Sequence, residues 1–152
     1  MTGMAMLRLL RPFRSMPDTG DKVHQQAAKF RQGIAQFNAR HFFDAHETWE
    51  EIWLQAAEPD KTFFQGIIQI AAAFHHYTRG NVRGACSLLT AGLRRLAAFS
   101  AVHPGIAYGI ALDPLRAAAQ HWVAALGEGR DLGVAQLPKI HDAKPEQVPA
   151  SE

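Results

Sequence analysis

The residues best suited to chemistry in this sequence lie together at positions 42–53, which read FFDAHETWEEIW. The stretch holds one histidine, three glutamates and two tryptophans. His46 and Glu50 are four residues apart, so on a helix the imidazole and the carboxylate lie on one face, one turn apart. Such a pair could hold a metal ion, carry out acid–base chemistry or join two helices through a polar network.

The first interpretation is a divalent metal ion. Imidazole and carboxylate suit zinc, iron or manganese, and the spacing of His46 and Glu50 lets both converge on one ion. A catalytic zinc ion takes at least three protein ligands, so a third must come from another helix. His76 is the candidate, although antiparallel helices joined near Ala57 place it about 10 Å too far along, at ~1.5 Å per residue.

The same antiparallel register identifies two closer neighbours of the pair. It places Glu50 level with about Phe64 or Gln65, and His46 level with about Ile68 or Gln69, on the helix expected at residues 61–79. Glutamine amides are poor ligands for these metals but form hydrogen bonds readily. We therefore predict a polar pocket that binds a divalent metal or a small ligand, and a metal-dependent hydrolase as the activity that such a site would allow.

Glu47 has two interpretations of equal weight. Residues 46–50 are close to the His-Glu-x-x-His pattern of zinc proteases, in which Glu47 would be the general base and Glu50 would replace the second histidine. Alternatively, Asp44 is the N-cap of the helix and Glu47 completes a capping box.

A further alternative needs no ligand. His46 would bond Glu50 or Gln69 in a buried structural network, while Trp49 and Trp53 pack the core. The protein would then be a non-catalytic helical interaction module.

The elements that must position these residues follow from hydrophobic periodicity. Apolar residues recur every three or four positions, and no stretch alternates as a half-buried strand would. Residues 61–79 are apolar almost all round, which predicts a central, buried helix. The expected N-caps are Asp21, Asp60, Asn81 and Asp113. The predicted helices cover about residues 21–38, 61–79, 82–99 and 114–126, and the motif helix begins at about 42 or 44 and ends at 54 or 55.

Short connections between these helices favour antiparallel neighbours. The predicted fold is therefore all-α, a single up-and-down bundle of about five antiparallel helices in residues 21–127. Residues 1–20 form a basic leader that we expect to be flexible; it could contact anionic surfaces, resemble a transit peptide or precede a start at Met16. Glycine, proline and charge dominate residues 128–152, which predicts a disordered polar tail.

Composition narrows the setting and the partners. Cys86 is the only cysteine of the 152 residues, which excludes an internal disulfide and favours a reducing, cytoplasmic location. The net charge is +2, and basic residues gather only in the leader and near 94–95, so nucleic acid is not the favoured ligand. No apolar run approaches the ~18 residues of a membrane span. A small molecule or a protein is the expected partner, and a homo-oligomer is allowed.

The motif also resembles that of a known family. His46, Glu50 and Trp53 form the pattern His-x-x-x-Glu-x-x-Trp, and further likeness lies at residues 37–38, 65–69, 75–76, 80–81 and 108–110. Together these residues resemble the domain of unknown function 309 family of bacteria and archaea, over roughly residues 28–126. The resemblance implies a small all-helical bundle and a metal bound through the motif.

Overall fold

The computed structural model describes residues 19–105 and 107–144. In this part of the chain five α-helices follow one another and no strand forms. The predicted all-α helical bundle is therefore confirmed. The helices are α2 (Thr19–Asn38), α3 (Phe42–Gln55), α4 (Asp60–Thr78), α5 (Val82–Val102) and α6 (Leu112–Gly127), and the short 3₁₀ helix η1 covers Val134–Gln136. The predicted leader lies outside the described residues, apart from the first two residues of α2.

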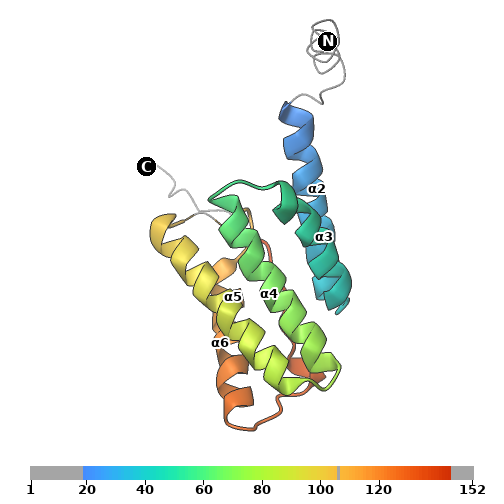
Figure 1. The fold of residues 1–152 in the computed structure, drawn as a ribbon, viewed down its shortest axis with the longest axis vertical. Helices are drawn as coiled ribbons and strands as arrows, with labels where there is room; N and C mark the ends of the chain where they lie inside the picture. The colour runs from blue at the N-terminus through green and yellow to red at the C-terminus, as the bar shows by residue number, and fades with distance from the viewer. Residues whose placement is uncertain (1–18, 106, 145–152) are drawn as a thin grey trace, which may run out of the picture.

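Helix α4 occupies the centre of the bundle, as its all-round apolar sequence predicts (Figure 1). Each helix packs against the next one in the chain, and α4 and α5 share the most extensive contact. The α4 residues Phe63 and Phe74 are both fully buried. The ring of Phe74 packs against Phe37 of α2, Phe42 of α3 and Trp122 of α6. One aromatic core thus joins four helices.

The close approach of α4 and α5 depends on two glycines. A Cβ atom at Gly92 would lie 2.8 Å from the carbonyl oxygen of Gly66, so either side chain would push the helices apart. Gly84 serves a different purpose, because a Cβ there would meet the Asn81 side chain at 2.5 Å. Asn81 is the predicted N-cap of α5, and its side chain accepts a hydrogen bond of 2.9 Å from the Gly84 N–H.

The acidic N-caps predicted for the other helices are wrong by one to three residues. Asp44, Asp60 and Asp113 each lie inside the first turn of a helix, where a carboxylate still interacts favourably with the helix dipole. Asp60 has a second partner, since its carboxylate accepts a hydrogen bond from the Tyr108 hydroxyl. Burial and this carboxylate raise the pKa of Tyr108 well above its usual range.

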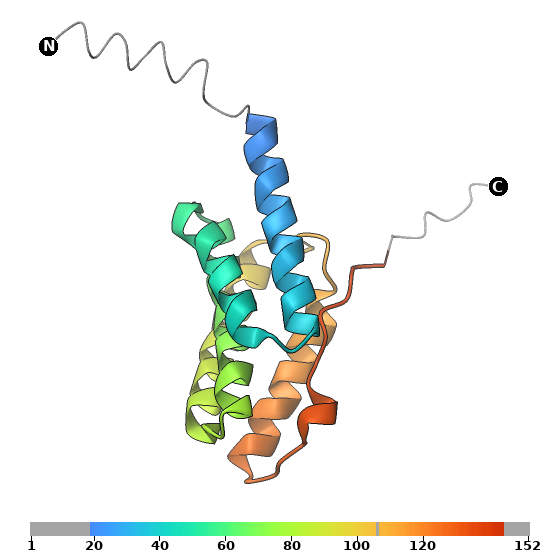
Figure 2. The same cartoon turned by 90° about the vertical axis from the view of Figure 1, so that its right-hand side faces the viewer.

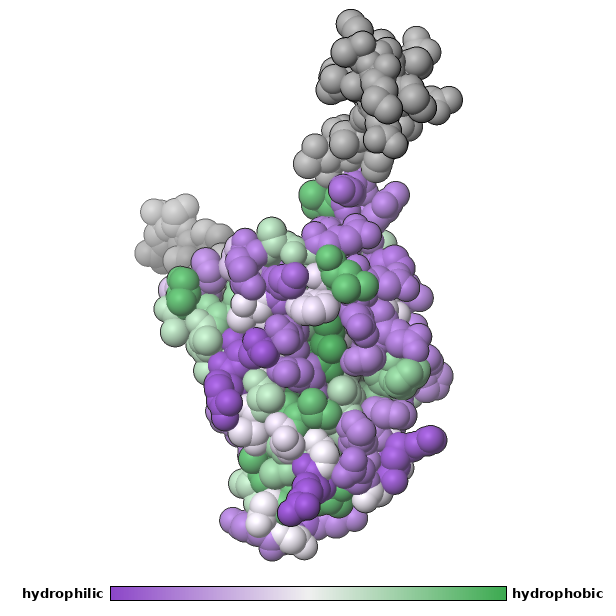
Figure 3. Space-filling model, in the orientation of Figure 1, coloured by the Kyte–Doolittle hydropathy of each residue, from purple (hydrophilic) through white to green (hydrophobic). Residues whose placement is uncertain are grey.

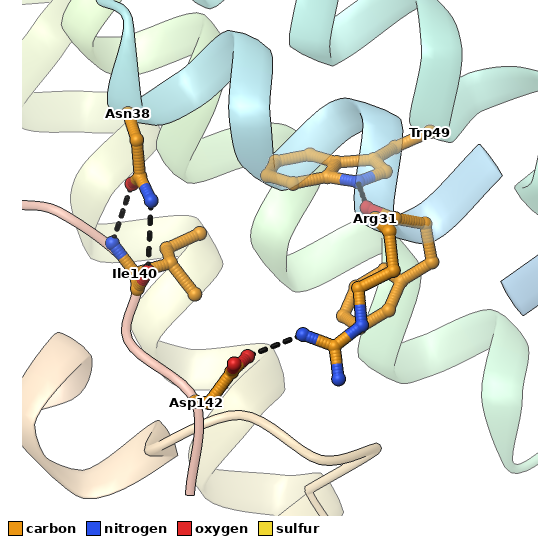
Figure 4. A network of polar contacts seen from close by, with 6 residues as sticks. Arg31, Asn38, Trp49, Ile140 and Asp142 are labelled. Atoms are coloured by element: carbon orange, nitrogen blue, oxygen red, sulfur yellow. Dashed lines mark hydrogen bonds and ion pairs between the residues drawn. The ribbon is translucent and has the colours of Figure 1, made fainter. Parts of the chain in front are cut away.

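Residues 137–143, which we call the C-terminal strap, correct the prediction of a disordered tail from residue 128. Leu137 and Ile140 are buried in the core. The Asn38 amide donates to the Ile140 carbonyl at 2.9 Å and accepts from the Ile140 N–H at 2.7 Å (Figure 4). Arg31 forms an ion pair with Asp142. The strap runs past the C-terminal end of α2 and beside α6 (Figure 2). The packed unit therefore extends beyond the predicted limit at residue 127.

Candidate functional site

The core face of α3 fixes the orientation of the motif. Trp49 is fully buried, and its indole N–H donates to the Phe30 carbonyl of α2 at 3.2 Å (Figure 4). The indole lies against Gly33, where a Cβ atom would come within 2.0 Å of the indole nitrogen. With Trp49 held in this way, the residues on the other faces of α3 point toward α4 and the surface.

His46 and Glu50 are brought together as the spacing predicts. The distance between His46 Nε2 and Glu50 Oε2 is 3.5 Å, and the side chains are 27% and 45% exposed. The Phe43 ring stacks on the His46 ring with a centroid separation of 5.8 Å. The pair is therefore accessible from the surface and not sealed in the core.

Three side-chain polar atoms of α3 and α4 are buried and have no hydrogen-bond partner among the described residues: His46 Nδ1, Trp53 Nε1 and Gln69 Oε1. An unpaired buried polar atom costs roughly 1–3 kcal/mol, so few are retained in native proteins. The hydrogen bond expected between His46 and Gln69 does not form. We refer to His46, Glu50 and Trp53 of α3, together with Gln69 of α4, as the motif row.

Two further residues border the motif row. The Lys61 ammonium lies 4.9 Å from the centre of the Trp53 ring, a cation–π contact. Gln65, a predicted neighbour of Glu50, is half-buried one turn before Gln69 on α4. The row thus has a cation at its Trp53 end and a carboxylate near its middle.

The structure does not gather His76 with the motif pair. Its Nδ1 atom lies 3.1 Å from the Asn81 amide nitrogen, at the turn between α4 and α5. Among the described residues, no three His, Cys, Asp or Glu side chains stand close enough together to hold a metal ion. A metal at His46 and Glu50 would need further ligands from outside these side chains.

His75 is the residue near the motif that the sequence did not indicate. Its ring lies 5.2 Å from the Phe43 ring, which also stacks on His46. Burial lowers the pKa of His75, and the charges of Arg79, His76 and His46 lower it further. Phe43 was the available signal, because an aromatic residue three positions before His46 covers the same helix face.

The remaining glutamates of the motif face solvent. Glu47 is exposed, and the predicted capping box is wrong because α3 begins at Phe42 without a side-chain cap. Glu51 forms an ion pair with Lys29 of α2. Glu47 as a general base stays a prediction.

His46 and Glu50 are partly exposed, and the main surface hollows lie elsewhere. Five hollows in the described part of the chain are lined by other residues, and His46, Glu50 and Gln69 line none of them.

Comparison with known proteins places the row inside a recognised segment. Residues 30–88 match the model of a family described as "Domain of unknown function (DUF309)". The uncharacterized protein YpuF of Bacillus subtilis (strain 168) is 36% identical over 67 residues, which is 43% of this chain and 38% of that protein. The chain thus spans well under half of the relative. The resemblance deduced from the motif is confirmed, and neither description names an activity.

Proposed function

We propose that the motif row, which lies within the segment that matches the DUF309 family model, binds a small, elongated polar molecule. The observation that carries the proposal is the set of three buried, unpaired polar atoms on His46, Trp53 and Gln69. A ligand that bonds these atoms would recover the energy lost when they were buried without partners.

The spacing of these atoms indicates the size of the ligand. His46 and Trp53 are seven residues apart on α3, a rise of about 10 Å at ~1.5 Å per residue. One metal ion cannot contact both ends of such a row. A linear organic molecule about as long as an extended tripeptide, at ~3.3 Å per residue, can contact both ends.

The charges along the row indicate the polarity of the ligand. At one end the Trp53 indole can only donate, and the Lys61 ammonium lies over the same ring. Near the middle of the row Glu50 supplies a carboxylate, and Gln69 of α4 supplies an unpaired carbonyl oxygen. A zwitterion with its carboxylate near Trp53 and its ammonium group near Glu50 matches this order.

A divalent metal is the second candidate, and the 3.5 Å separation of His46 Nε2 and Glu50 Oε2 favours it. Both atoms can bind one zinc, iron or manganese ion at ordinary distances of about 2.0–2.2 Å. Water or the organic ligand would complete the coordination. A metal-bound water would then allow hydrolysis, with Glu47 as the nearest free carboxylate in the sequence.

Indole N–H resonances in a nitrogen-15 NMR spectrum test the first candidate. Trp53 reports on the row, whereas Trp49 and Trp122 donate to the backbone carbonyls of Phe30 and Gln136 and serve as internal controls. We expect triglycine or a linear amino acid of similar length to shift the Trp53 signal saturably. Acetate, which reaches one end only, should act much more weakly.

Variants distinguish the two candidates. Gln69→Leu and Lys61→Gln should weaken the zwitterion response and leave a zinc response at His46 unchanged, whereas Glu50→Gln should weaken both. No Trp53 shift with any zwitterion would contradict the first candidate. If neither ligand class binds and His46→Ala lowers the free energy of unfolding, the structural network of an interaction module is favoured instead.

A further inference from the structure

Helix α5 exposes an unusual amount of apolar sequence. Among the described residues it is the one helix long and apolar enough to cross a membrane by length and composition, a test that core helices of soluble proteins also pass. Only 28% of its apolar stretch is buried, whereas a core helix would be mostly buried. In Figure 3 the surface over α5 mixes pale green and white with dark purple. The outer face of α5 therefore carries small, weakly apolar side chains with charged ones between them.

Three surface hollows overlap end to end along this outer face. The first and second share Thr62 and Ala98, and the second and third share Ala91 and Arg94. They form one continuous depression, which we call the α5 track. Its main lining residues are Glu58, Arg83, Ser87, Ala91, Arg94 and Ala98.

The charges of the α5 track are distributed unevenly. Helix α5 contains three arginines and no aspartate or glutamate. Arg83 lies at the end of the track where the helix begins, and Glu58 lies at the opposite end beside Val102. Val102 is 71% exposed. The track therefore has a cation at one end and an anion next to an exposed valine at the other.

We propose that the α5 track is the interface of a homodimer in which two copies of α5 pack antiparallel about a two-fold axis. A two-fold interface requires that each contact be repeated with the roles exchanged, and this track meets that requirement. Antiparallel pairing brings Arg83 of each copy to Glu58 of the other. Both ion pairs form at once, and both exposed Val102 side chains are covered.

The helix register agrees with this pairing. Ser87 and Ala98 are equidistant from the midpoint between Ala91 and Arg94, and so are Arg83 and Val102. An axis at that midpoint places Ser87 against Ala98 of the other copy, and Ala91 against the other copy's Arg94. Ser87, Ala91 and Ala98 are small, which lets the helix backbones approach closely on either side of Arg94. His46, Glu50 and Trp53 of the motif row lie on α3, which contributes no residue to the α5 track, so the dimer leaves them open.

Light scattering after gel filtration tests the proposal on the full chain. We expect the wild type to be a dimer at micromolar concentration, and Arg83→Glu and Glu58→Arg each to be monomeric. The double variant restores the ion pair with its charges exchanged, so it should dimerise again. Gln32→Glu, an exposed change on α2, is the control and should leave the dimer intact.

Cross-linking tests the register. In a Cys86→Ala background, Ser87→Cys combined with Ala98→Cys should form a disulfide-linked dimer on mild oxidation. The two cysteines of one copy cannot join, because eleven residues of helix separate them by about 16 Å at ~1.5 Å per residue. Ser87→Cys alone should cross-link far less.

Three outcomes would overturn the proposal. One is a wild type that stays monomeric up to its solubility limit. Another is a dimer that Arg83→Glu does not weaken. The third is a monomer whose α5 binds vesicles containing anionic lipid, which would assign the face to a membrane surface.

Discussion

The two tryptophans of α3 face different surroundings, and the contrast separates what holds the fold from what the fold presents. Trp49 is fully buried, packs against Gly33 and donates to the Phe30 carbonyl. The Trp53 indole nitrogen is also buried, yet it has no partner among the described residues. One turn of helix thus carries a satisfied donor and an unsatisfied one.

The same contrast appears between two amide side chains. Asn38 bonds both backbone groups of Ile140 and anchors the C-terminal strap. Gln69 has a buried carbonyl oxygen without a partner. Folding stability alone would favour an apolar residue at position 69, so its polar group indicates a requirement other than stability.

The largest test of this contrast is truncation of the two tryptophans. Trp49→Ala should lower the free energy of unfolding by about 4 kcal/mol, since it removes a buried aromatic side chain and leaves a cavity. Trp53→Ala should cost less than half as much, because Trp53 lies at the edge of the core. Urea denaturation with an unchanged m-value measures both. Equal losses would mean that the two faces of α3 contribute alike to the fold.

The second test compares the two amides. Asn38→Ala should cost about 2 kcal/mol, because it leaves the Ile140 N–H and carbonyl without their partners. Gln69→Leu should change stability by about 0.5 kcal/mol or less, since it replaces an unpaired buried polar atom with an apolar one of similar size. Thermal and urea unfolding check the pair. A larger loss for Gln69→Leu would show that the motif row is structural.

A smaller effect is expected from Trp53→Phe. The change keeps an aromatic ring beside Lys61 and removes the unpaired indole N–H. Stability should stay within about 0.5 kcal/mol of the wild type, while binding of a ligand through the N–H is lost. Calorimetry with the ligand found by NMR measures the binding. Unaltered affinity would remove Trp53 from the motif row as a donor.

The smallest effect concerns pH. Burial and neighbouring positive charges lower the pKa of His75 from its ordinary value of 6.5, so the unfolded chain takes up this proton first as the pH falls. Stability should therefore decline as the pH drops below about 6.5 and level off below the folded pKa. His75→Gln should remove this part of the decline. Unfolding curves at several pH values compare the two proteins, and identical pH profiles would contradict the assignment.

Much of the fold could be predicted because helical periodicity is a local signal. The central position of α4 follows from its all-round apolar sequence, and the Asn81 cap follows from its place after a glycine. The exact helix starts could not be predicted, since an aspartate serves a helix equally as a cap or within the first turn.

Features that depend on distant contacts were missed. Leu137 and Ile140 are two isolated apolar residues in a polar segment, and contacts with distant residues order them, among them Asn38, 102 residues away from Ile140. In the site, spacing alone found the His46–Glu50 pair. It placed Gln69 beside His46 as a bonded partner, whereas both side chains retain unpaired atoms. His75 lies near the site because its ring and the ring of His46 both contact Phe43. Phe43 belongs to α3, so the helical pattern of α4 alone could not reveal this contact.

The C-terminal strap also determines when the protein can finish folding during synthesis. Asn38 leaves the ribosome long before Ile140, with 102 residues between them. At about 5–20 residues per second, the nascent chain waits roughly 5–20 s before the strap can meet α2. During that interval the part of the core that Leu137 and Ile140 complete stays open to water and to chaperones. The helices that form early thus complete their shared core only when the C-terminal strap, near the end of the described residues, has been synthesised.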